Sequence, residues 1–524
     1  MFISESKLKI AWILAGSLLM TMWLWSDNLQ AQWGMIDDHE IIRILGTKNT
    51  VTLSEISEQF RYSEARNPGM LPRYRPAYSI LKFAEAWMWG ANPHLWYIAR
   101  MSMFCISLAI LWWLAAEGLG LLLAAGFCMY LLTSPYWPGL WACLGAGESY
   151  CCFGLALAAL GTYLLWMRNQ TPGAYAVSWI LVDVGVVVAA GSKENFVLLA
   201  LPLAWLLIRE RRAGRLRPGL GVAGALTLTY CLFIGGVVVL IMSRQGADMY
   251  GNSVAIGKRS SLVLNLLSGS EGFRFLVTVI PIAIWVSRYI FHDSSQVRAA
   301  TMRGILQRFA LTESILAVVY AGQIIFYDGG WQADSRYAFP GDTAIIFGVL
   351  YVPLYFLLEC RQFMPQAAAR RVATYLGSAL IVFSCWLGYD ASKLPAKANA
   401  RRTKAFSSAL VRIEQAAAKD QAVPVVLWSA EVGDFEKIIA VSAFVKARGV
   451  KNPVLLQTAS PYPSAGLTPQ LAALLSKEIE GIKAGERGFA RSQLFEEARS
   501  CVAIGFYKDA PLGKCTSLGH ILDE

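Results

Sequence analysis

Charged residues are scarce in this chain. Of its 524 residues only 16% are Asp, Glu, Lys or Arg, and 56% are hydrophobic, whereas soluble domains have about a quarter of their residues charged. The charges also stand in short blocks between apolar runs that are long enough to cross a bilayer. This pattern excludes a soluble globular protein and predicts an α-helical polytopic membrane protein. We expect about eleven transmembrane helices, near residues 10–26, 95–116, 118–134, 150–167, 174–190, 196–208, 219–242, 273–291, 309–327, 342–359 and 372–388.

Small residues are missing from the end of the first span, where a signal peptidase would need them. Trp23 and Trp25 stand there instead, and Lys7 and Lys9 precede the span. This arrangement indicates an uncleaved signal anchor whose tryptophans lie at the membrane interface.

Lys and Arg are absent from the short loop 135–149, whereas the connection 209–217 carries five arginines. Because Lys and Arg accumulate in cytoplasmic loops, we predict a cytoplasmic N-terminus. Loop 27–94 and, after an odd number of spans, the C-terminal tail then lie outside. Loop 27–94 has seven basic residues, but the rule weakens for loops of this length. The net charge of +11 is mostly an insertion signal, and we expect no nucleic-acid partner.

Glycosylation acceptors of the Asn-x-Ser/Thr type are absent from the outward segments, and the triplet at 169–171 lies on the cytoplasmic side. This favours a bacterial source, and hence the bacterial inner membrane with a periplasmic tail. Most of the ten cysteines lie in or beside apolar spans, where they behave as small hydrophobic residues. Cys501 and Cys515 lie in the tail, where a periplasmic disulfide and two unpaired thiols are both open.

The tail lacks a glycine-rich nucleotide motif, metal-ligand spacing and a nucleophile motif. Strand and helix patterns alternate along it, which indicates a small α/β domain. We therefore divide the chain into a transmembrane domain, 1–390, and a soluble periplasmic domain, 391–524, with a structural or acceptor-binding role. The predicted helices of the tail are 396–420, 435–448 and 472–484, and its predicted strands are 423–428, 454–456 and 502–506.

Internal repeats of the kind that transporters carry are absent as well. The polar motifs are concentrated on the outward side, where the large loops are 27–94, 243–272 and 328–341. Within the first of these loops, apolar residues recur at helical spacing around 53–60 and 80–87. We predict two amphipathic helices there, lying in the plane of the membrane interface.

The acidic stretch Asp37-Asp38-His39-Glu40 follows the first span directly. The bilayer interior does not tolerate such a cluster, so it lies at or above the membrane surface. A carboxylate beside another carboxylate and near lipid has a raised pKa, which suits a general base. We assign this role to Asp37 or Asp38, with His39 as a supporting residue and Glu40 at the start of a helix 41–46. A solvated acidic loop and a helix N-terminus that favours acids are the alternatives.

Cations stand in three of the outward segments. Arginine binds phosphate oxygens through a planar fork, and a charged pair at membrane depth is costly unless it has a function. Cations near the lipid surface suit a phosphate whose lipid tail lies in the bilayer. Interfacial arginines that meet lipid headgroups, and a tight turn with surface charges, are the alternatives. The candidate residues are Arg73, Arg75, Lys193, Arg336 and Tyr337, with Glu194 next to Lys193.

Three further acids lie in or beside apolar helices. Glu85 shares a helical face with apolar residues, so its carboxylate needs a partner, for which we expect Arg75 or Lys193. Glu148 opens the fourth predicted span on the outward side and is a candidate supporting residue. Asp183 lies inside the fifth predicted span, and the sequence suggests no partner for it.

The order and sidedness of these motifs resemble those of the GT-C glycosyltransferases, polytopic enzymes that use polyprenyl-phosphate sugars. Asp37-Asp38 matches the acidic pair that those enzymes carry in the first outward loop. The resemblance covers roughly residues 1–390, and a soluble C-terminal domain is also common in that family. The other similar segments are Arg75-Pro76 with Ala84 to Trp87, Trp89 to Pro93, Ile98-Ala99-Arg100, Ser192-Lys193-Glu194 and Ser335 to Pro340.

The resemblance implies an inverting glycosyltransferase that works at the outer face of the membrane. Asp37, with Asp38 as second choice, would take the proton from the acceptor hydroxyl. Arg75, Lys193 and Arg336 would stabilise the departing lipid phosphate. The donor would be a polyprenyl-phosphate-linked sugar, and the acceptor a glycan, lipid or protein of the cell envelope, as in polysaccharide or lipopolysaccharide biosynthesis.

The resemblance implies that a divalent metal is a possible cofactor, because some members of the family use one at the acidic pair and others do not. Two adjacent acids with a histidine can bind Mg²⁺ or Mn²⁺, but no complete ligand set is visible in the sequence. We therefore expect no obligatory metal.

Two other functions remain open. A transporter or flippase of a lipid-linked saccharide would also use intramembrane charges, and Asp183 fits this function better. A transporter should, however, have its charged residues near the middle of the bilayer and contain internal repeats. A non-enzymatic assembly scaffold rests on the tail alone and would leave Asp37 dispensable.

Overall fold

The computed structural model describes most of the first half of the chain and parts of the second half. The described residues are 5–62, 74–166, 171–245, 336, 339–351, 354, 366–429, 435–458, 479, 501–506 and 515–520.

Within these residues, six helices are long and apolar enough to cross a membrane, and each overlaps a predicted span. Predicted spans 118–134 and 196–208 correspond to shorter helices. Spans 273–291 and 309–327 lie outside the described residues and 342–359 lies partly outside, so the total of about eleven stays a prediction. The six helices are Lys7–Gln30, Pro93–Leu119, Glu148–Trp166, Pro172–Ser192, Pro218–Ile241 and Arg371–Ala417.

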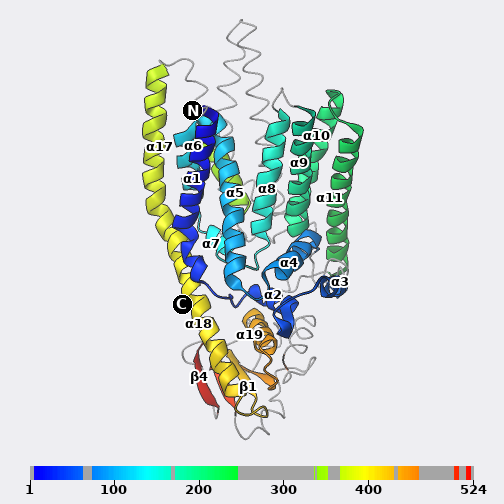
Figure 1. The fold of residues 1–524 in the computed structure, drawn as a ribbon, viewed down its shortest axis with the longest axis vertical. Helices are drawn as coiled ribbons and strands as arrows, with labels where there is room; N and C mark the ends of the chain where they lie inside the picture. The colour runs from blue at the N-terminus through cyan, green and yellow to red at the C-terminus, as the bar shows by residue number, and fades with distance from the viewer. Residues whose placement is uncertain are drawn as a thin grey trace.

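The membrane helices run side by side as a bundle (Figure 1). Several begin at a proline, whose missing N–H and fixed φ suit the first helical turn. Asn92 and Thr171 cap two of these starts by accepting the backbone N–H of His94 and of Ala174. The bundle contains α1 (Glu5–Trp25), α5 (Pro93–Leu119), α6 (Leu121–Leu131), α8 (Glu148–Trp166), α9 (Pro172–Ser192), α10 (Ala200–Arg212), α11 (Pro218–Gln245), α15 (Gly341–Ile346) and α17 (Gln366–Gly388), with the π-helical segment η5 (Phe347–Tyr351) after α15.

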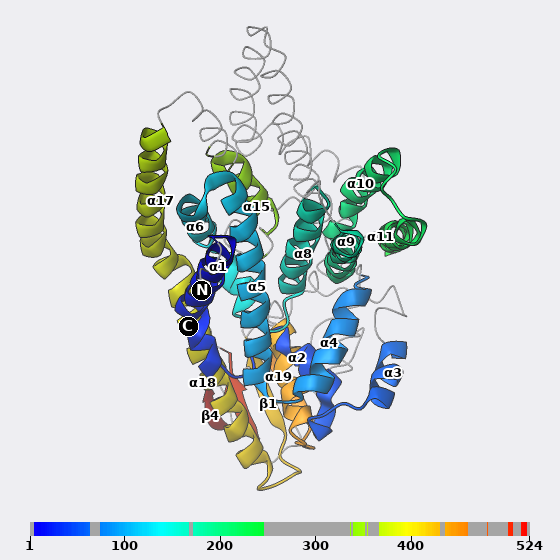
Figure 2. The same cartoon turned by 45° about the horizontal axis from the view of Figure 1, so that its top comes forward.

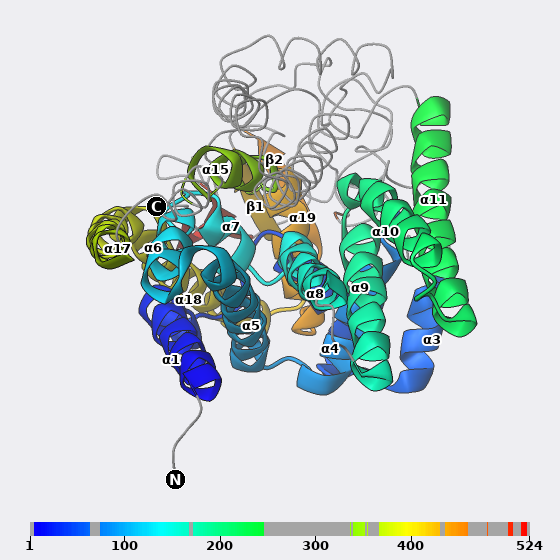
Figure 3. The same ribbon diagram turned by 90° about the horizontal axis from the view of Figure 1, so that it is seen from above.

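Glycines bring α8 and α9 into close contact, and Figure 3 shows the two helices adjacent when seen from above. A Cβ on Gly185 would lie 2.5 Å from the backbone nitrogen of Ala158, and one on Gly161 would lie 2.5 Å from the carbonyl oxygen of Ser178. Small residues let membrane helices approach in this way. The pair therefore holds the start of α8 and the end of α9 in a fixed relation.

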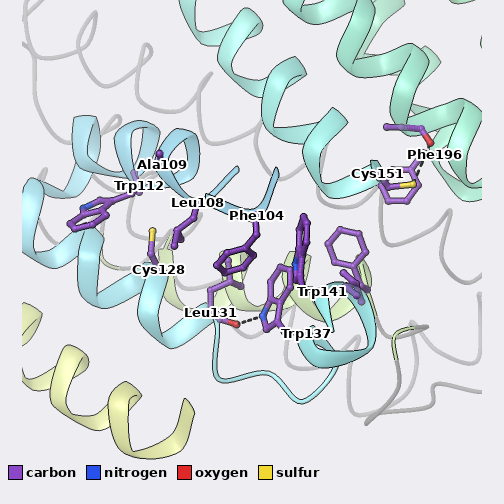
Figure 4. Packing of buried hydrophobic residues seen from close by; sticks show 14 of the residues in the cluster. Phe104, Leu108, Ala109, Trp112, Cys128, Leu131, Trp137, Trp141, Cys151 and Phe196 are labelled. Atoms are coloured by element: carbon purple, nitrogen blue, oxygen red, sulfur yellow. Dashed lines mark hydrogen bonds between the residues drawn. The ribbon is translucent and has the colours of Figure 1, made fainter. Parts of the chain in front are cut away.

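The hydrophobic core of the bundle is rich in aromatic side chains, and Figure 4 shows Phe104 and Trp112 of α5 with two tryptophans of the short helix α7 (Trp137–Trp141). Phe104 packs edge-on against Trp25 at 5.6 Å and against Trp141 at 5.2 Å between ring centroids. Trp137 donates its indole N–H to the carbonyl oxygen of Leu131 at 2.7 Å. The buried indole is thereby satisfied, and α7 is tied to the end of α6.

Short helices form a layer at one end of the bundle, between the membrane helices and the α/β domain (Figures 1 and 2). The two amphipathic helices predicted around 53–60 and 80–87 are confirmed as α3 and α4, and the helix predicted at 41–46 as α2. The elements of this layer are η1 (Ser26–Gln30), α2 (Asp38–Leu45), η2 (Gly46–Lys48), α3 (Leu53–Tyr62), α4 (Pro76–Trp89), α7 (Trp137–Trp141) and η3 (Glu194–Leu199).

A long helical run connects the membrane bundle to the C-terminal domain. It begins with α17, passes through the π-helical segment η7 (Tyr389–Lys393) and continues as α18 (Leu394–Ala417), the charged helix predicted at 396–420. It passes the predicted domain boundary at residue 390 without interruption, and Figure 1 shows it along one side of the molecule.

The C-terminal domain contains a four-stranded parallel sheet with strand order β2-β1-β3-β4. Val425 of the central strand β1 pairs with Val454 on one side and with Val502 on the other. All five residues of β1 are buried, as is usual for a parallel sheet. The elements are β1 (Val425–Ser429), α19 (Phe435–Ala447), β2 (Val454–Thr458), β3 (Val502–Gly505) and β4 (Thr516–His520).

The predicted strands 423–428, 454–456 and 502–506 and helix 435–448 are therefore confirmed, while helix 472–484 lies outside the described residues. The structure adds a strand that the sequence did not predict, β4, which follows 502–506 and lies at the sheet edge. Cys501 and Cys515 form a disulfide that ties β3 to β4. Of the two alternatives for these cysteines, a disulfide and two unpaired thiols, the structure therefore has the disulfide.

The layer of short helices and the C-terminal domain share one hydrophobic cluster. It contains Ile41 and Leu45 of α2, Phe406 of α18, and Ile438 and Phe444 of α19. Helix α19 packs directly against α2, as Figure 2 also shows. The domain is thus joined by a common core to the helix that begins right after Asp37.

Candidate active site

Asp37 is the central residue of a tight turn. Its φ of 68° and ψ of −40° fit a γ-turn of positive φ, which the backbone N–H of Asp38 closes on the carbonyl oxygen of Ile36 at 2.9 Å. Such backbone strain costs of order 1–3 kcal/mol and persists only where the surroundings enforce it. The Asp37 side chain keeps 25% of its surface exposed. The fold therefore holds an accessible carboxylate in a strained conformation.

A backbone segment from the α7–α8 connection lies against this turn. A Cβ on Gly145 would come within 2.2 Å of the Asp37 Cβ, so a side chain does not fit at position 145. Tyr78 donates its hydroxyl to the carbonyl oxygen of Gly145 at 2.9 Å. Lys82 and Arg100 both donate to the carbonyl oxygen of Leu144, the latter at 3.1 Å. Side chains from α4 and α5 thus fix the backbone on which Asp37 rests.

Asp38 has a different environment from its neighbour. It is only 1% exposed, and its two oxygens accept the backbone N–H of Gly34 at 2.6 Å and of Gly145 at 3.0 Å. Burial raises the pKa of Asp38 to about 7, although these hydrogen bonds and the nearby charge of Lys82 oppose the rise. Asp38 holds the turn together, and its surface is closed to solvent.

The pKa of Asp37 departs from the sequence-based expectation. Burial raises this pKa, but the guanidinium of Arg336, which is ion-paired and hydrogen-bonded to the carboxylate, brings it below its ordinary value. The predicted rise is therefore wrong for Asp37, because the sequence could not show that a cation from position 336 lies against it. The rise is found at Asp38 instead.

Arg336 belongs to a chain of alternating charges along the ends of α8 and α9. Its Nε lies 4.0 Å from Oε1 of Glu148, and the same oxygen accepts from Lys193 Nζ at 2.5 Å. Arg75 binds both carboxylate oxygens of Glu194, each at 2.9 Å. The structure thus gathers the predicted cations Arg75, Lys193 and Arg336 in one region. Each cation is paired with a carboxylate, but the partners of Arg75 and Lys193 are Glu194 and Glu148, not Glu85 as the sequence analysis expected.

Burial separates these cations into two groups. Lys193 is almost fully buried, whereas Arg75 and Arg336 keep 17% and 23% of their side-chain surface exposed. Two guanidiniums are therefore accessible to an anion from outside, and Lys193 is linked to Arg336 because both contact Glu148. Planar guanidiniums of this kind suit a phosphate.

The predicted partner of Glu85 was wrong. Glu85 accepts from Arg100 at 3.0 Å and from the hydroxyl of Tyr150, not from Arg75 or Lys193. The reason is the turn at Gly90, with φ of 53°, which leads directly from α4 into α5 and brings Arg100 back against Glu85. An arginine inside an apolar span was the signal available in the sequence, since such a charge needs a buried partner.

Sequence reasoning also missed the role of Lys82. This lysine is buried, and its ammonium lies within 5.6 Å of the ring centroids of Tyr78, Trp96 and Tyr150. Burial lowers the pKa of Lys82 to about 7. Its position one turn before Glu85 on the same helix was the available signal. The side chain is enclosed by aromatic rings, and its hydrogen bond to the carbonyl oxygen of Leu144 supports the segment beneath Asp37.

One other candidate, His39, lies beside the described site, and two more candidates lie outside the described residues. His39 lies half-buried on α2, where burial lowers its pKa despite the neighbouring carboxylates of Glu40, Asp37 and Glu436. Arg73 and Tyr337 lie outside the described residues.

The acidic pair does not fit a divalent metal as it stands. N–H groups occupy both oxygens of Asp38, and a guanidinium lies against Asp37. In the part of the chain that the structure describes, no group of three or more His, Cys, Asp or Glu residues could hold a metal ion. The absence of an obligatory metal stays a prediction.

The fold and site together define a helical membrane protein with an acid and cation cluster at one end of its bundle. No family model matches this chain, and no curated protein matches it. Among solved structures it is similar to ArnT from Cupriavidus metallidurans. The likeness to ArnT bound to undecaprenyl phosphate has 12% sequence identity and a TM-score of 0.44, over 89% of this chain and 87% of ArnT. For apo ArnT these values are 12% and 0.44, over 90% and 89%. A likeness of this strength establishes no family.

Proposed function

We propose that this protein is a GT-C-type glycosyltransferase that transfers a sugar from a polyprenyl-phosphate donor to a cell-envelope glycan, lipid or protein. One observation carries the proposal. The accessible carboxylate of Asp37 is held in a strained turn and faces a cation, Arg336, that also neighbours Glu148. A base beside a phosphate-binding cation at the end of membrane helices suits a hydroxyl acceptor and a lipid-phosphate leaving group.

In the proposed reaction Asp37 accepts the proton of the acceptor hydroxyl. The hydroxyl oxygen forms a bond to the anomeric carbon while the bond from that carbon to the phosphate oxygen breaks. The electron pair leaves with the polyprenyl phosphate, and the configuration at the anomeric carbon is inverted. Arg336 and Arg75 stabilise the charge that develops on the phosphate, and Lys193 supports Arg336 through Glu148.

Donor binding also prepares the base in this mechanism. While Arg336 is paired with Asp37, the pKa of the carboxyl is low, and a weakly basic carboxylate is a poor proton acceptor. A donor phosphate that draws Arg336 toward itself removes this influence, and burial then raises the pKa of Asp37. The base becomes stronger when the leaving group is in place.

The test is Asp37→Asn in purified enzyme supplied with a polyprenyl-phosphate sugar and an envelope acceptor fraction. Loss of a general base lowers the rate by about 10²–10⁴-fold, while expression and membrane insertion should be unchanged. Asp27→Asn is the matched control, because Asp27 pairs with Lys393 at 2.6 Å, away from the site. Full transfer activity in both Asp37→Asn and Asp38→Asn would rule out the proposed mechanism.

We further infer a bacterial inner-membrane location with the site and the C-terminal domain on the periplasmic side. The Cys501–Cys515 disulfide supports this, since disulfides persist in oxidising compartments. The arginine-rich turn between α10 and α11 supports it as well. It lies at the end of the bundle opposite to the α/β domain (Figure 1), where the positive-inside rule places the cytoplasm.

A second candidate function, a flippase of a lipid-linked saccharide, rests on Asp183. This residue lies within the candidate span α9, and its Oδ1 is buried without a hydrogen-bond partner in the described part of the chain. Intramembrane carboxylates of this kind mark transport pathways in other proteins. Vesicle assays that measure lipid translocation separately from sugar transfer distinguish the two functions, and Asp183→Asn should abolish only the former.

A further inference from the structure

A second cluster of charges lies at the end of the bundle opposite to Asp37. The turn between α10 and α11 contains five arginines and one glutamate within residues 209–217. Glu148 and Trp166 mark the two ends of α8, and a helix of this length separates them by roughly 27 Å. Because Trp166 lies against this arginine turn, the turn is not part of the site around Asp37.

The turn has a defined structure built around a buried acid. Glu210 is 0% exposed and accepts from Arg215 at 2.6 Å and from the hydroxyl of Tyr175 at 3.3 Å. Its backbone carbonyl accepts the N–H of Arg215 and of Leu216. Gly214 allows the reversal with φ of 66°. Glu210 Oε1 also lies 3.8 Å from Arg209 Nε, so the buried acid pairs with both Arg209 and Arg215.

Arg209 lies flat against aromatic rings at the side of this turn. Its guanidinium carbon is 4.0 Å from the ring centroid of Trp166 and 5.6 Å from that of Trp205. The Nη1 atom of Arg209 is buried and lacks a hydrogen-bond partner within the described residues. A buried donor without an acceptor costs free energy. An acceptor oxygen from a bound molecule would therefore be stabilised by a hydrogen bond from Arg209.

The other three guanidiniums face solvent. Arg211, Arg212 and Arg217 are exposed, and no ion pair to an acidic residue is present for them in the part of the chain that the structure describes. Beside them, Trp205 and Ile208 expose 41% and 53% of their surface. The region therefore offers guanidiniums for phosphate oxygens next to an apolar wall for a hydrocarbon chain.

We propose that this turn binds the headgroup of an anionic membrane phospholipid, in the leaflet opposite to the α/β domain. The phosphodiester oxygens contact Arg211, Arg212 and Arg217 and satisfy Arg209, while an acyl chain lies along Trp205 and Ile208. Basic pockets between membrane helices on the cytoplasmic side bind anionic headgroups in this way. The proposal does not depend on the glycosyltransferase function.

The experiment is a lipid titration of the purified full-length protein, delipidated in neutral detergent and followed by native mass spectrometry. We expect phosphatidylglycerol to bind and phosphatidylcholine to bind at least about tenfold more weakly, because an anionic surface gains about fivefold per nearby arginine. Replacing Arg211, Arg212 and Arg217 together by Gln should weaken phosphatidylglycerol binding by about tenfold or more. Replacing the same three by Lys should preserve most of it.

A matched control removes three exposed cations elsewhere. Lys397→Gln, Arg401→Gln and Lys419→Gln change the net charge equally on the side of the soluble domain, and together they should leave phosphatidylglycerol binding unchanged. Arg212→Gln alone, with an expected loss of up to about fivefold, replaces the triple variant if that variant does not fold.

Four results would overturn the proposal. The first three are equal binding of the two lipids, unchanged binding in the Gln variants, and an equal loss in the control variant. Displacement of phosphatidylglycerol from this turn by stoichiometric undecaprenyl phosphate would assign the turn to the polyprenyl carrier and would equally exclude a phospholipid.

Discussion

The carboxylate of Asp37 is subject to two opposing influences. Burial raises its pKa and the adjacent guanidinium of Arg336 lowers it, with a net result below the ordinary value. A single arginine therefore decides both the protonation of the proposed base and part of the charge available to a phosphate. This dual role makes Arg336 more informative to vary than a cation that only binds substrate.

Arg336→Gln should shift the acid limb of the pH profile of kcat/KM to higher pH. Loss of the cation leaves burial as the main influence, so the pKa of Asp37 rises, and a higher pH is needed to deprotonate it. Arg336→Lys keeps the charge and should leave the limb near its original position, although the overall rate falls because the bidentate geometry is lost. The measurement is the pH dependence of sugar transfer. An acid limb at the same pH in all three proteins would contradict this account.

At the scale of the element, the connection between α7 and α8 acts as the support of the site. Lys82, Arg100 and Tyr78 hold its backbone carbonyls, and the Gly145 N–H holds Asp38. The buried groups that sequence analysis missed are therefore mostly groups that fix this one segment.

Gly145→Ala tests this support without changing any charge. The added Cβ would overlap the Asp37 Cβ at 2.2 Å, so either the turn or the segment must move. A displacement of about 1 Å at a reacting group costs about 10²-fold in rate, and we expect this loss in kcat with little change in the KM for the donor. Gly173→Ala is the control, since a Cβ there meets nothing within 4 Å. A kcat within about twofold of wild type for Gly145→Ala would show that the contact does not position Asp37.

The limits of sequence prediction are also clearest at this scale. Helices α3, α4 and α19 could be predicted from the sequence, because their apolar residues recur at helical spacing. Strand β4 could not, because Thr516-Ser517-Leu518-Gly519-His520 lies at a sheet edge and needs no apolar run. Asp37 and Arg336 were both named as candidates, yet their ion pair joins positions 299 residues apart. Pairing over such a distance depends on the packing of whole helices and leaves no local pattern.

For the molecule as a whole, the strained turn at Asp37 is anchored on both sides by the C-terminal part of the chain. Before the turn, the backbone N–H of Gln32 donates to Thr403 of α18 at 3.0 Å, and Lys404 donates to Gln30. After the turn, α2 packs against α19 within the common hydrophobic cluster. The domain that carries no catalytic motif thereby supplies part of the constraint that the strained residue requires.

The buried hydroxyl of Thr403 allows this coupling to be measured. Thr403→Val keeps the shape of the side chain but leaves the Gln32 N–H without its acceptor, which costs about 1–3 kcal/mol. If about 1.4 kcal/mol of this cost appears in the activation free energy, kcat falls by about tenfold, and we expect the donor KM to be preserved. We also expect faster amide hydrogen exchange over residues 31–38. Thr403→Ser retains the hydroxyl and should restore both readouts, and Lys404→Gln, which removes an exposed bond, should have little effect on either. If Thr403→Val keeps wild-type kcat and wild-type exchange at 31–38, the C-terminal domain does not constrain the turn, and the strain at Asp37 must be held by the α7–α8 segment alone.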